Sequence, residues 1–153
     1  MIKKAIYIQV NDLLKNPPEN VKITVIDPNN ITRLDIRIAG PEGTPYEGGL
    51  FHFEMILDRD TFPCQPPEVV LRTKIYHPNV INQIGQLDLQ ILNPHYWRPS
   101  IKLRKLIEEL INFLKHPEDG VCHSCDPEIG YEIASNRELF IQKAKQWTEQ
   151  FAH

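Results

Sequence analysis

The sequence has few of the features that mark membrane, secreted or nucleic-acid-binding proteins. No apolar run approaches the roughly 20 residues that a membrane-spanning helix needs, and residues 1–4 do not begin a secretory signal. Only 3 of the 153 residues are cysteines, an odd number that does not suggest a framework of disulfides. The formal net charge of -3 lacks the positive excess of a nucleic-acid-binding surface. Together these absences predict a cytoplasmic or nuclear protein whose partners are neither membranes nor nucleic acids.

What the sequence does contain is typical of one globular domain over residues 1–153. Hydrophobic residues make up 41% of the chain and charged residues 24%, which suits a domain with a buried core. No repeat, low-complexity tract or linker divides the chain, and no cofactor-binding motif is present. We therefore expect a single domain without a cofactor.

Hydrophobic periodicity predicts helices at both ends of an α+β fold. Apolar residues three and four positions apart predict a first helix over residues 2–15, which ends before a pair of prolines. The same spacing predicts a helix over residues 102–114, and a short helix is expected over 128–134. A last helix is expected after the capping pair at 135–136. Its inward-facing residues are expected to be Phe140, Ala144, Trp147 and Phe151.

Between these helices four strands are expected, two of which, over residues 33–39 and 50–57, show alternating apolar residues. Short connections between them favour an antiparallel meander. The strands are expected at residues 22–26, 33–39, 50–57 and 68–73. Residues 74–100 show no sustained period, and an irregular segment of that length in a compact domain is usually functional. We therefore expect the functional residues between the sheet and the later helices.

Five short motifs occur in order along nearly the whole chain. They are the Gly-Pro to Gly-Gly turn at 40–49, Phe-Pro-Cys-Gln-Pro-Pro at 62–67, Lys-Ile-Tyr-His-Pro-Asn at 74–79, Trp-Arg-Pro-Ser at 97–100 and Trp-Thr at 147–148. Together these motifs resemble those of the ubiquitin-conjugating enzyme family. The resemblance implies the fold of that family: an N-terminal helix, a four-stranded antiparallel meander, an irregular active-site segment and C-terminal helices. It also implies protein partners, namely ubiquitin or a ubiquitin-like protein and an active conjugating enzyme or ligase.

The chain departs from the family pattern at Asp88. Members of the family carry ubiquitin as a thioester on a cysteine within a Gly-x-x-Cys-Leu-x-Ile-Leu string. Here residues 85–92 are Gly-Gln-Leu-Asp-Leu-Gln-Ile-Leu, which places Asp88 at the cysteine position. One extra residue also lies between Asn79 and this string.

A carboxylate is a poor replacement for that thiol. A free cysteine, with a pKa of about 8.5, is partly thiolate at neutral pH and intrinsically very nucleophilic. An aspartate is ionised but attacks a thioester poorly, and its product would be a mixed anhydride more reactive than the thioester consumed. Asp88 is therefore predicted to be a solvated residue at a relict site.

The resemblance also implies roles for three other residues. In the family, the residue at Asn79 donates a hydrogen bond to the oxyanion that forms when a lysine attacks the thioester. The residue at Asp126 helps to orient or deprotonate that lysine. Without a thioester, structural roles are expected instead, with Asn79 and His77 holding the local loop and Asp126 forming a turn before a proline.

The loop over residues 114–127 is longer than its family counterpart and contains Cys122 and Cys125. Three interpretations of these thiols stay open. In the first interpretation, both thiols are ligands of a zinc site, with His116 or His123 as a further ligand. Alternatively, one of them replaces the missing nucleophile, or both are incidental loop residues.

Positions that contact partners in the family are changed as well. Lys4 keeps a basic residue in the first helix, whereas Ile8 stands where basic residues are common. Cys64 replaces the bulky apolar anchor of the first contact loop, while Arg98 and Pro99 retain the character of the second. Because interface anchors are normally large and buried, these changes predict weaker contacts with activating enzymes and ligases.

These departures favour a catalytically inactive variant of the family that serves as a non-enzymatic partner or regulator in conjugation. One alternative is an active conjugating enzyme that uses Cys122 or Cys125. Another is an active enzyme whose native cysteine was replaced at Asp88. A third is a structural adaptor without any ubiquitin function.

Overall fold

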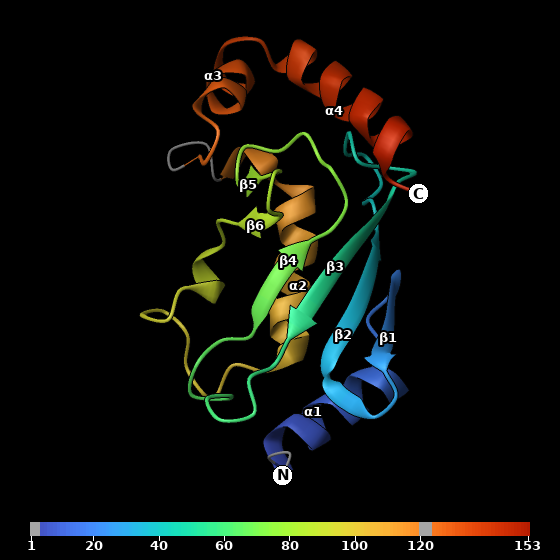
Figure 1. The fold of residues 1–153 in the computed structure, drawn as a ribbon. Helices are drawn as coiled ribbons and strands as arrows, with labels where there is room; N and C mark the ends of the chain where they lie inside the picture. Colours follow the sequence, from blue (N-terminus) through green and yellow to red (C-terminus); the bar gives the residue numbers. More distant parts are fainter. Residues whose placement is uncertain (1–3, 120–123) are drawn as a thin grey trace.

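The computed structural model describes residues 4–119 and 124–153. It confirms the predicted α+β class, with an N-terminal helix, an antiparallel sheet and C-terminal helices (Figure 1). Helix α1 (Lys4–Lys15) buries Ile6, Val10 and Leu13, whose spacing had predicted it. Ile2, which was expected on the same face, lies outside the described residues. Among the helices of the described ranges, none is long and apolar enough to cross a membrane.

The four predicted strands form an antiparallel meander. They are β1 (Val21–Asp27), β2 (Asn30–Ala39), β3 (Leu50–Ile56) and β4 (Glu68–Leu71). Ile36 pairs with Phe53, and Phe53 in turn pairs with Leu71, so one row of apolar side chains crosses the inner face of the sheet. The alternation of apolar residues had predicted this face.

The sheet continues beyond the predicted meander. Within the segment that was expected to be irregular, β5 (Val80–Ile81) and β6 (Gln86–Leu87) form a short hairpin. Strand β6 pairs with β4, so the strand order is β1-β2-β3-β4-β6-β5. The expectation of four strands was therefore too low, because a strand of two residues is too short to show any alternation. A 3₁₀ turn, η1 (Gln90–Leu92), follows β6.

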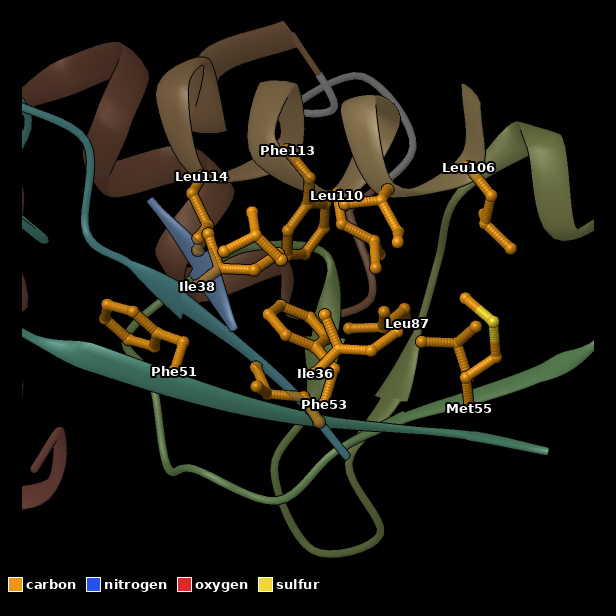
Figure 2. Close-up of a cluster of buried hydrophobic side chains, with 14 of the residues drawn as sticks. Ile36, Ile38, Phe51, Phe53, Met55, Leu87, Leu106, Leu110, Phe113 and Leu114 are labelled. Atoms are coloured by element: carbon orange, nitrogen blue, oxygen red, sulfur yellow. The ribbon is translucent and has the colours of Figure 1, made fainter. Parts of the chain in front are cut away.

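Helix α2 (Leu103–Lys115) covers one face of the sheet and closes the core. Figure 2 shows side chains of α2 pointing toward those of β2 and β3. The predicted apolar stripe of α2 is buried, and Phe113 extends it. The residues labelled in the figure are Ile36, Ile38, Phe51, Phe53, Met55, Leu87, Leu106, Leu110, Phe113 and Leu114.

The last two helices, α3 (Pro127–Ser135) and α4 (Arg137–Phe151), lie at the end of the molecule opposite α1 (Figure 1). Phe140 and Ala144 are buried as predicted, but Trp147 and Phe151 are only partly buried. Thr148 takes the inward position. It lies so close to Gly49 that a Cβ atom on that glycine would stand 2.6 Å from the Thr148 methyl group. The small threonine is therefore buried because the backbone approaches closely, which periodicity does not reveal.

Candidate functional site

A groove of about 580 Å³ lies between α2 and the segments that flank the β5–β6 hairpin. Three of the predicted site residues, His77, Asn79 and Asp88, line this groove together. Its other lining residues are Leu89, Gln90, Asn93, Glu109, Asn112, Phe113, His116 and Asp119. The motif segment and the end of α2 thus form one concave site.

The hairpin explains why Asn79 and Asp88 are neighbours. Asn79 directly precedes β5 and Asp88 directly follows β6, and Val80 pairs with Leu87 in the antiparallel register. The next pair outward is therefore Asn79 and Asp88. The Asp88 N–H donates a hydrogen bond to the Asn79 carbonyl oxygen at 2.9 Å. The Asn79 amide Nδ2 donates to Asp88 Oδ2 across 3.4 Å, a long contact between a buried amide and an exposed carboxylate.

Gly85 allows the chain to turn within this hairpin. Its φ angle is +70°, in the left-handed region that glycine adopts most easily. A Cβ atom at this position would lie 2.1 Å from the carbonyl oxygen of Leu71. The Gly85 carbonyl also accepts a hydrogen bond from the Leu71 N–H at 2.9 Å, which attaches the hairpin to β4. Glycine is therefore needed for both the turn and the close approach.

His77 anchors the motif segment to α2. Its ring stacks on Phe113 with a centroid distance of 3.9 Å and an interplanar angle of 15°. The Asn79 N–H donates to His77 Nδ1 at 3.1 Å, so the proton of the neutral ring is on Nε2, which lies 2.9 Å from the Phe113 carbonyl oxygen. Complete burial lowers the pKa of His77 to about 4, so the ring is neutral at pH 7. Both ring nitrogens are therefore hydrogen-bonded to backbone atoms of the protein, and one face of the ring packs on Phe113.

Asp126 connects the second loop to the same segment. Its side-chain Oδ1 accepts hydrogen bonds from the N–H groups of Glu128 and Ile129 at 3.1 and 3.3 Å, which makes it the N-cap of α3. Its own N–H donates to the Pro78 carbonyl oxygen at 3.1 Å. Asp126 thus holds the start of α3 against the His-Pro-Asn segment.

Cys125 is placed next to Asp126 and within electrostatic reach of Asp88. Partial desolvation raises the pKa of the exposed Cys125 thiol, and the negative charges of Asp88 and Asp126 raise it further. Its thiolate fraction at neutral pH is therefore smaller than that of an ordinary cysteine. Cys122 and His123, which were predicted as an alternative nucleophile and as metal ligands, lie outside the described residues.

The described residues contain no group of three or more His, Cys, Asp or Glu side chains arranged to hold a metal ion. His116, considered above as a zinc ligand, has its Nδ1 3.5 Å from a carboxylate oxygen of Glu118. Because the Cys-x-x-Cys hypothesis also involves Cys122, it stays a prediction.

The positions predicted to contact partners are exposed at one end of the molecule. Cys64, Arg98 and Pro99 are all exposed, and Lys4 is exposed in the first turn of α1. The two contact loops are joined by a hydrogen bond of 2.8 Å from Trp97 Nε1 to the Pro63 carbonyl oxygen. Figure 1 shows both loops at the same end as the N-terminus.

Sequence reasoning missed the contribution of α2 to the groove. Glu109, Asn112, Phe113 and His116 line it. Their spacing of three, one and three residues is that of one helical face, so a second stripe beside the apolar one was visible in the sequence. Nothing in a single helix, however, shows that this stripe faces His77.

Three comparisons with known proteins agree with this geometry. A family model described as ubiquitin-conjugating enzyme matches residues 5–148. Ubiquitin-conjugating enzyme E2 S of Aquarana catesbeiana is 34% identical over 150 residues, which cover 98% of this chain and 68% of that protein. Ubiquitin conjugating enzyme E2 B of Dictyostelium discoideum is 28% identical over 149 residues, with 97% of both chains covered.

A solved structure agrees as well. The E2 domain of a Toxoplasma gondii ubiquitin conjugating enzyme superposes with a TM-score of 0.83 at 34% identity, and 97% of each chain is covered. The resemblance that the motifs suggested is therefore confirmed over nearly the whole length. The chain belongs to the ubiquitin-conjugating enzyme family.

Proposed function

We propose that this chain is a catalytically inactive member of its family, which acts as a non-enzymatic partner or regulator in the conjugation of ubiquitin or a ubiquitin-like protein. The observation that carries the proposal is Asp88. The motif resemblance aligns it with the family cysteine, and in the structure it directly follows β6 and lines the groove. A carboxylate there offers no thiolate for accepting ubiquitin from an activating enzyme.

The surroundings of Asp88 support a binding role. The groove is open in the structure. Its walls are held by the β5–β6 hairpin, by the hydrogen bond of His77 to α2 and by the N-cap at Asp126. Both contact loops are also present and exposed. A scaffold with these features suits the recognition of family partners without the transfer step.

A charging assay tests the proposal. The protein is incubated with activating enzyme, ubiquitin and ATP and is then run on gels with and without reductant. We expect no adduct that reductant removes, and the Asp88→Cys variant is the matched control that shows whether the activating enzyme still recognises the scaffold. A reducible adduct on the unmodified chain would contradict the proposal.

A second assay tests the binding role itself. The ¹⁵N-labelled protein is titrated in separate experiments with ubiquitin and with active conjugating enzymes, and NMR chemical shifts are followed. Saturable shifts with one of them are expected. If none of them changes the spectrum, the alternative of a structural adaptor without ubiquitin function replaces the proposal.

One observation favours a second candidate function, in which Cys125 accepts ubiquitin. Its thiol is close enough to Asp88 for the two to interact electrostatically, so it lies near the family's reaction centre. Against this, the raised pKa makes it a weaker nucleophile at neutral pH. This candidate predicts a reducible adduct in the charging assay that disappears in the Cys122→Ser, Cys125→Ser double variant.

A further inference from the structure

A second groove lies between the turn-rich loop before β3, the end of α2 and the start of α4. Its volume is about 320 Å³. Its lining includes Pro45 from the loop, Lys115 from the end of α2, and Arg137, Ile141 and Lys145 from α4. It shares no lining residue with the groove at Asp88.

Three cations surround this second groove. Arg137 and Lys145 are eight residues apart on α4, with Ile141 midway between them, so all three lie on one helical face. Lys115, in the last turn of α2, also lines the groove. A lysine in the last turn of a helix interacts favourably with the helix dipole. That interaction is worth only about 0.3–1 kcal/mol, so Lys115 can also bind an anionic ligand.

None of these cations is engaged within the part of the chain that the structure describes. No carboxylate there lies within 4.0 Å of the charged nitrogens of Lys115, Arg137 or Lys145, whereas Lys143 on the same helix is paired with Glu132 at 2.8 Å. The absence of partners is therefore specific to this face of α4.

The two carboxylates that line the groove have other contacts. Glu47 Oε2 accepts a hydrogen bond from the Gly43 N–H at 3.3 Å. A carboxylate oxygen of Glu118 lies 3.5 Å from His116 Nδ1. Three unpaired cations thus remain available to a ligand in a groove that has only two carboxylates.

Apolar side chains lie among the cations. Phe140 is buried, Ile141 is partly buried, and Pro45 and Pro117 complete the apolar part of the lining. A free inorganic anion would use only the cations, whereas a peptide with acidic and apolar side chains would use both kinds of surface. Arginine and lysine are the residues that recognise carboxylate and phosphoryl groups at such sites.

We propose that this second groove binds an anionic peptide segment, in which carboxylate or phosphoryl groups lie next to an apolar residue. Arg137, Lys115 and Lys145 contact the anionic groups, and the partly buried Ile141 and Pro45 contact the apolar side chain. None of these contacting residues lines the groove at Asp88.

Fluorescence anisotropy with the full chain tests the proposal. The probes are a labelled peptide with glutamates flanking a leucine, the same peptide with phosphoserines in place of the glutamates, and a neutral version with glutamines. We expect the two anionic peptides to bind, the neutral peptide to bind at least tenfold more weakly, and higher salt to weaken binding. Tighter binding of the phosphoserine peptide indicates a phosphoryl ligand, and tighter binding of the glutamate peptide indicates a carboxylate ligand.

A matched pair of double variants locates the binding. Lys115→Gln with Lys145→Gln removes two groove cations and is expected to weaken peptide binding about tenfold. The control is Lys15→Gln with Lys22→Gln, which removes one lysine from the last turn of α1 and one exposed lysine from β1. It changes the net charge equally and is expected to leave the affinity within twofold.

Three results would overturn the proposal. Equal weakening by both double variants would show attraction to overall charge rather than to this groove. Equal binding of the neutral peptide would remove the role of the cations. Tighter binding of a single-stranded oligonucleotide of matched charge, with the same loss in the groove variant, would assign the groove to a nucleic acid instead of a peptide.

Discussion

Replacing Gly85 by alanine should disrupt the hairpin on which the Asp88 site depends. Gly85 has a φ angle of +70°, and a left-handed conformation costs a residue with a side chain about 1–2 kcal/mol. The added Cβ would also lie 2.1 Å from the Leu71 carbonyl oxygen, so the backbone must move. Overpacking of this kind costs about 1–3 kcal/mol, and loss of the Leu71–Gly85 hydrogen bond costs about 0.5–1.5 kcal/mol more. We expect Gly85→Ala to lower the free energy of unfolding by about 2.5–6.5 kcal/mol, the sum of these three costs.

Gly43→Ala is the matched control for this prediction. Gly43 has a φ angle of +80°, yet a Cβ atom there would meet no heavy atom within 4 Å. Its cost should therefore be the conformational component alone, about 1–2 kcal/mol. The difference between the two variants isolates the close approach of the hairpin to β4.

Urea denaturation followed by tryptophan fluorescence measures both variants under the same conditions. NMR chemical shifts of Asn79 and Asp88 add a local measurement, which should change in Gly85→Ala and not in Gly43→Ala. If Gly85→Ala destabilises no more than Gly43→Ala and leaves those shifts unchanged, the backbone contact does not hold the site and the reasoning is wrong.

Three further predictions concern His77, Glu54 and Cys125. Because burial lowers the folded-state pKa of His77 to about 4, from about 6.5 in the unfolded chain, its contribution is fully present above pH 6.5 and is lost as pH falls toward 4. His77→Gln should therefore flatten the dependence of unfolding free energy on pH between 7 and 4, by up to about 3 kcal/mol, and an unchanged slope would contradict the burial argument. Glu54 is buried on the outer side of β3 between Arg33 and Arg72. Glu54→Ala should therefore lower the free energy of unfolding in urea by about 1–3 kcal/mol. The control, Glu42→Ala at an exposed turn, should lower it by under about 0.5 kcal/mol. Asp88→Asn removes a negative charge near Cys125, which should lower the pKa of that thiol and speed its alkylation by iodoacetamide. Mass spectrometry of the modified peptide measures the alkylation rate. The rate at the exposed Cys64 should stay constant.

The elements that sequence periodicity predicted are those with one face in the core. The first four strands and the helix under them alternate or repeat because one side of each element packs against the other layer. The β5–β6 hairpin was missed, since two residues per strand leave no pattern to recognise. Trp147 was expected to face inward but is only partly buried, because the space beside Gly49 accepts the smaller Thr148.

The residues of the candidate site could be selected from sequence motifs, but their contacts depend on how the helices pack. His77, Asn79 and Asp88, which the motifs singled out in the sequence, line one groove. The stacking partner of His77 was not predicted, because Phe113 is 36 residues away and only the docking of α2 on the sheet brings them together. The cations of the second groove come from two helices that are also distant in sequence.

The sequence by itself determined which chemical groups are present, among them a carboxylate at position 88 and two thiols within residues 114–127. Side-chain chemistry belongs to the residue, so the presence of a carboxylate at position 88 needed no coordinates. Only the tertiary structure decided what each group meets. The short hairpin pairs Asn79 with Asp88, and the N-cap at Asp126 keeps Cys125 near the same carboxylate. The physical reason is that pKa values, grooves and contacts arise from neighbours across the fold, which sequence order does not specify.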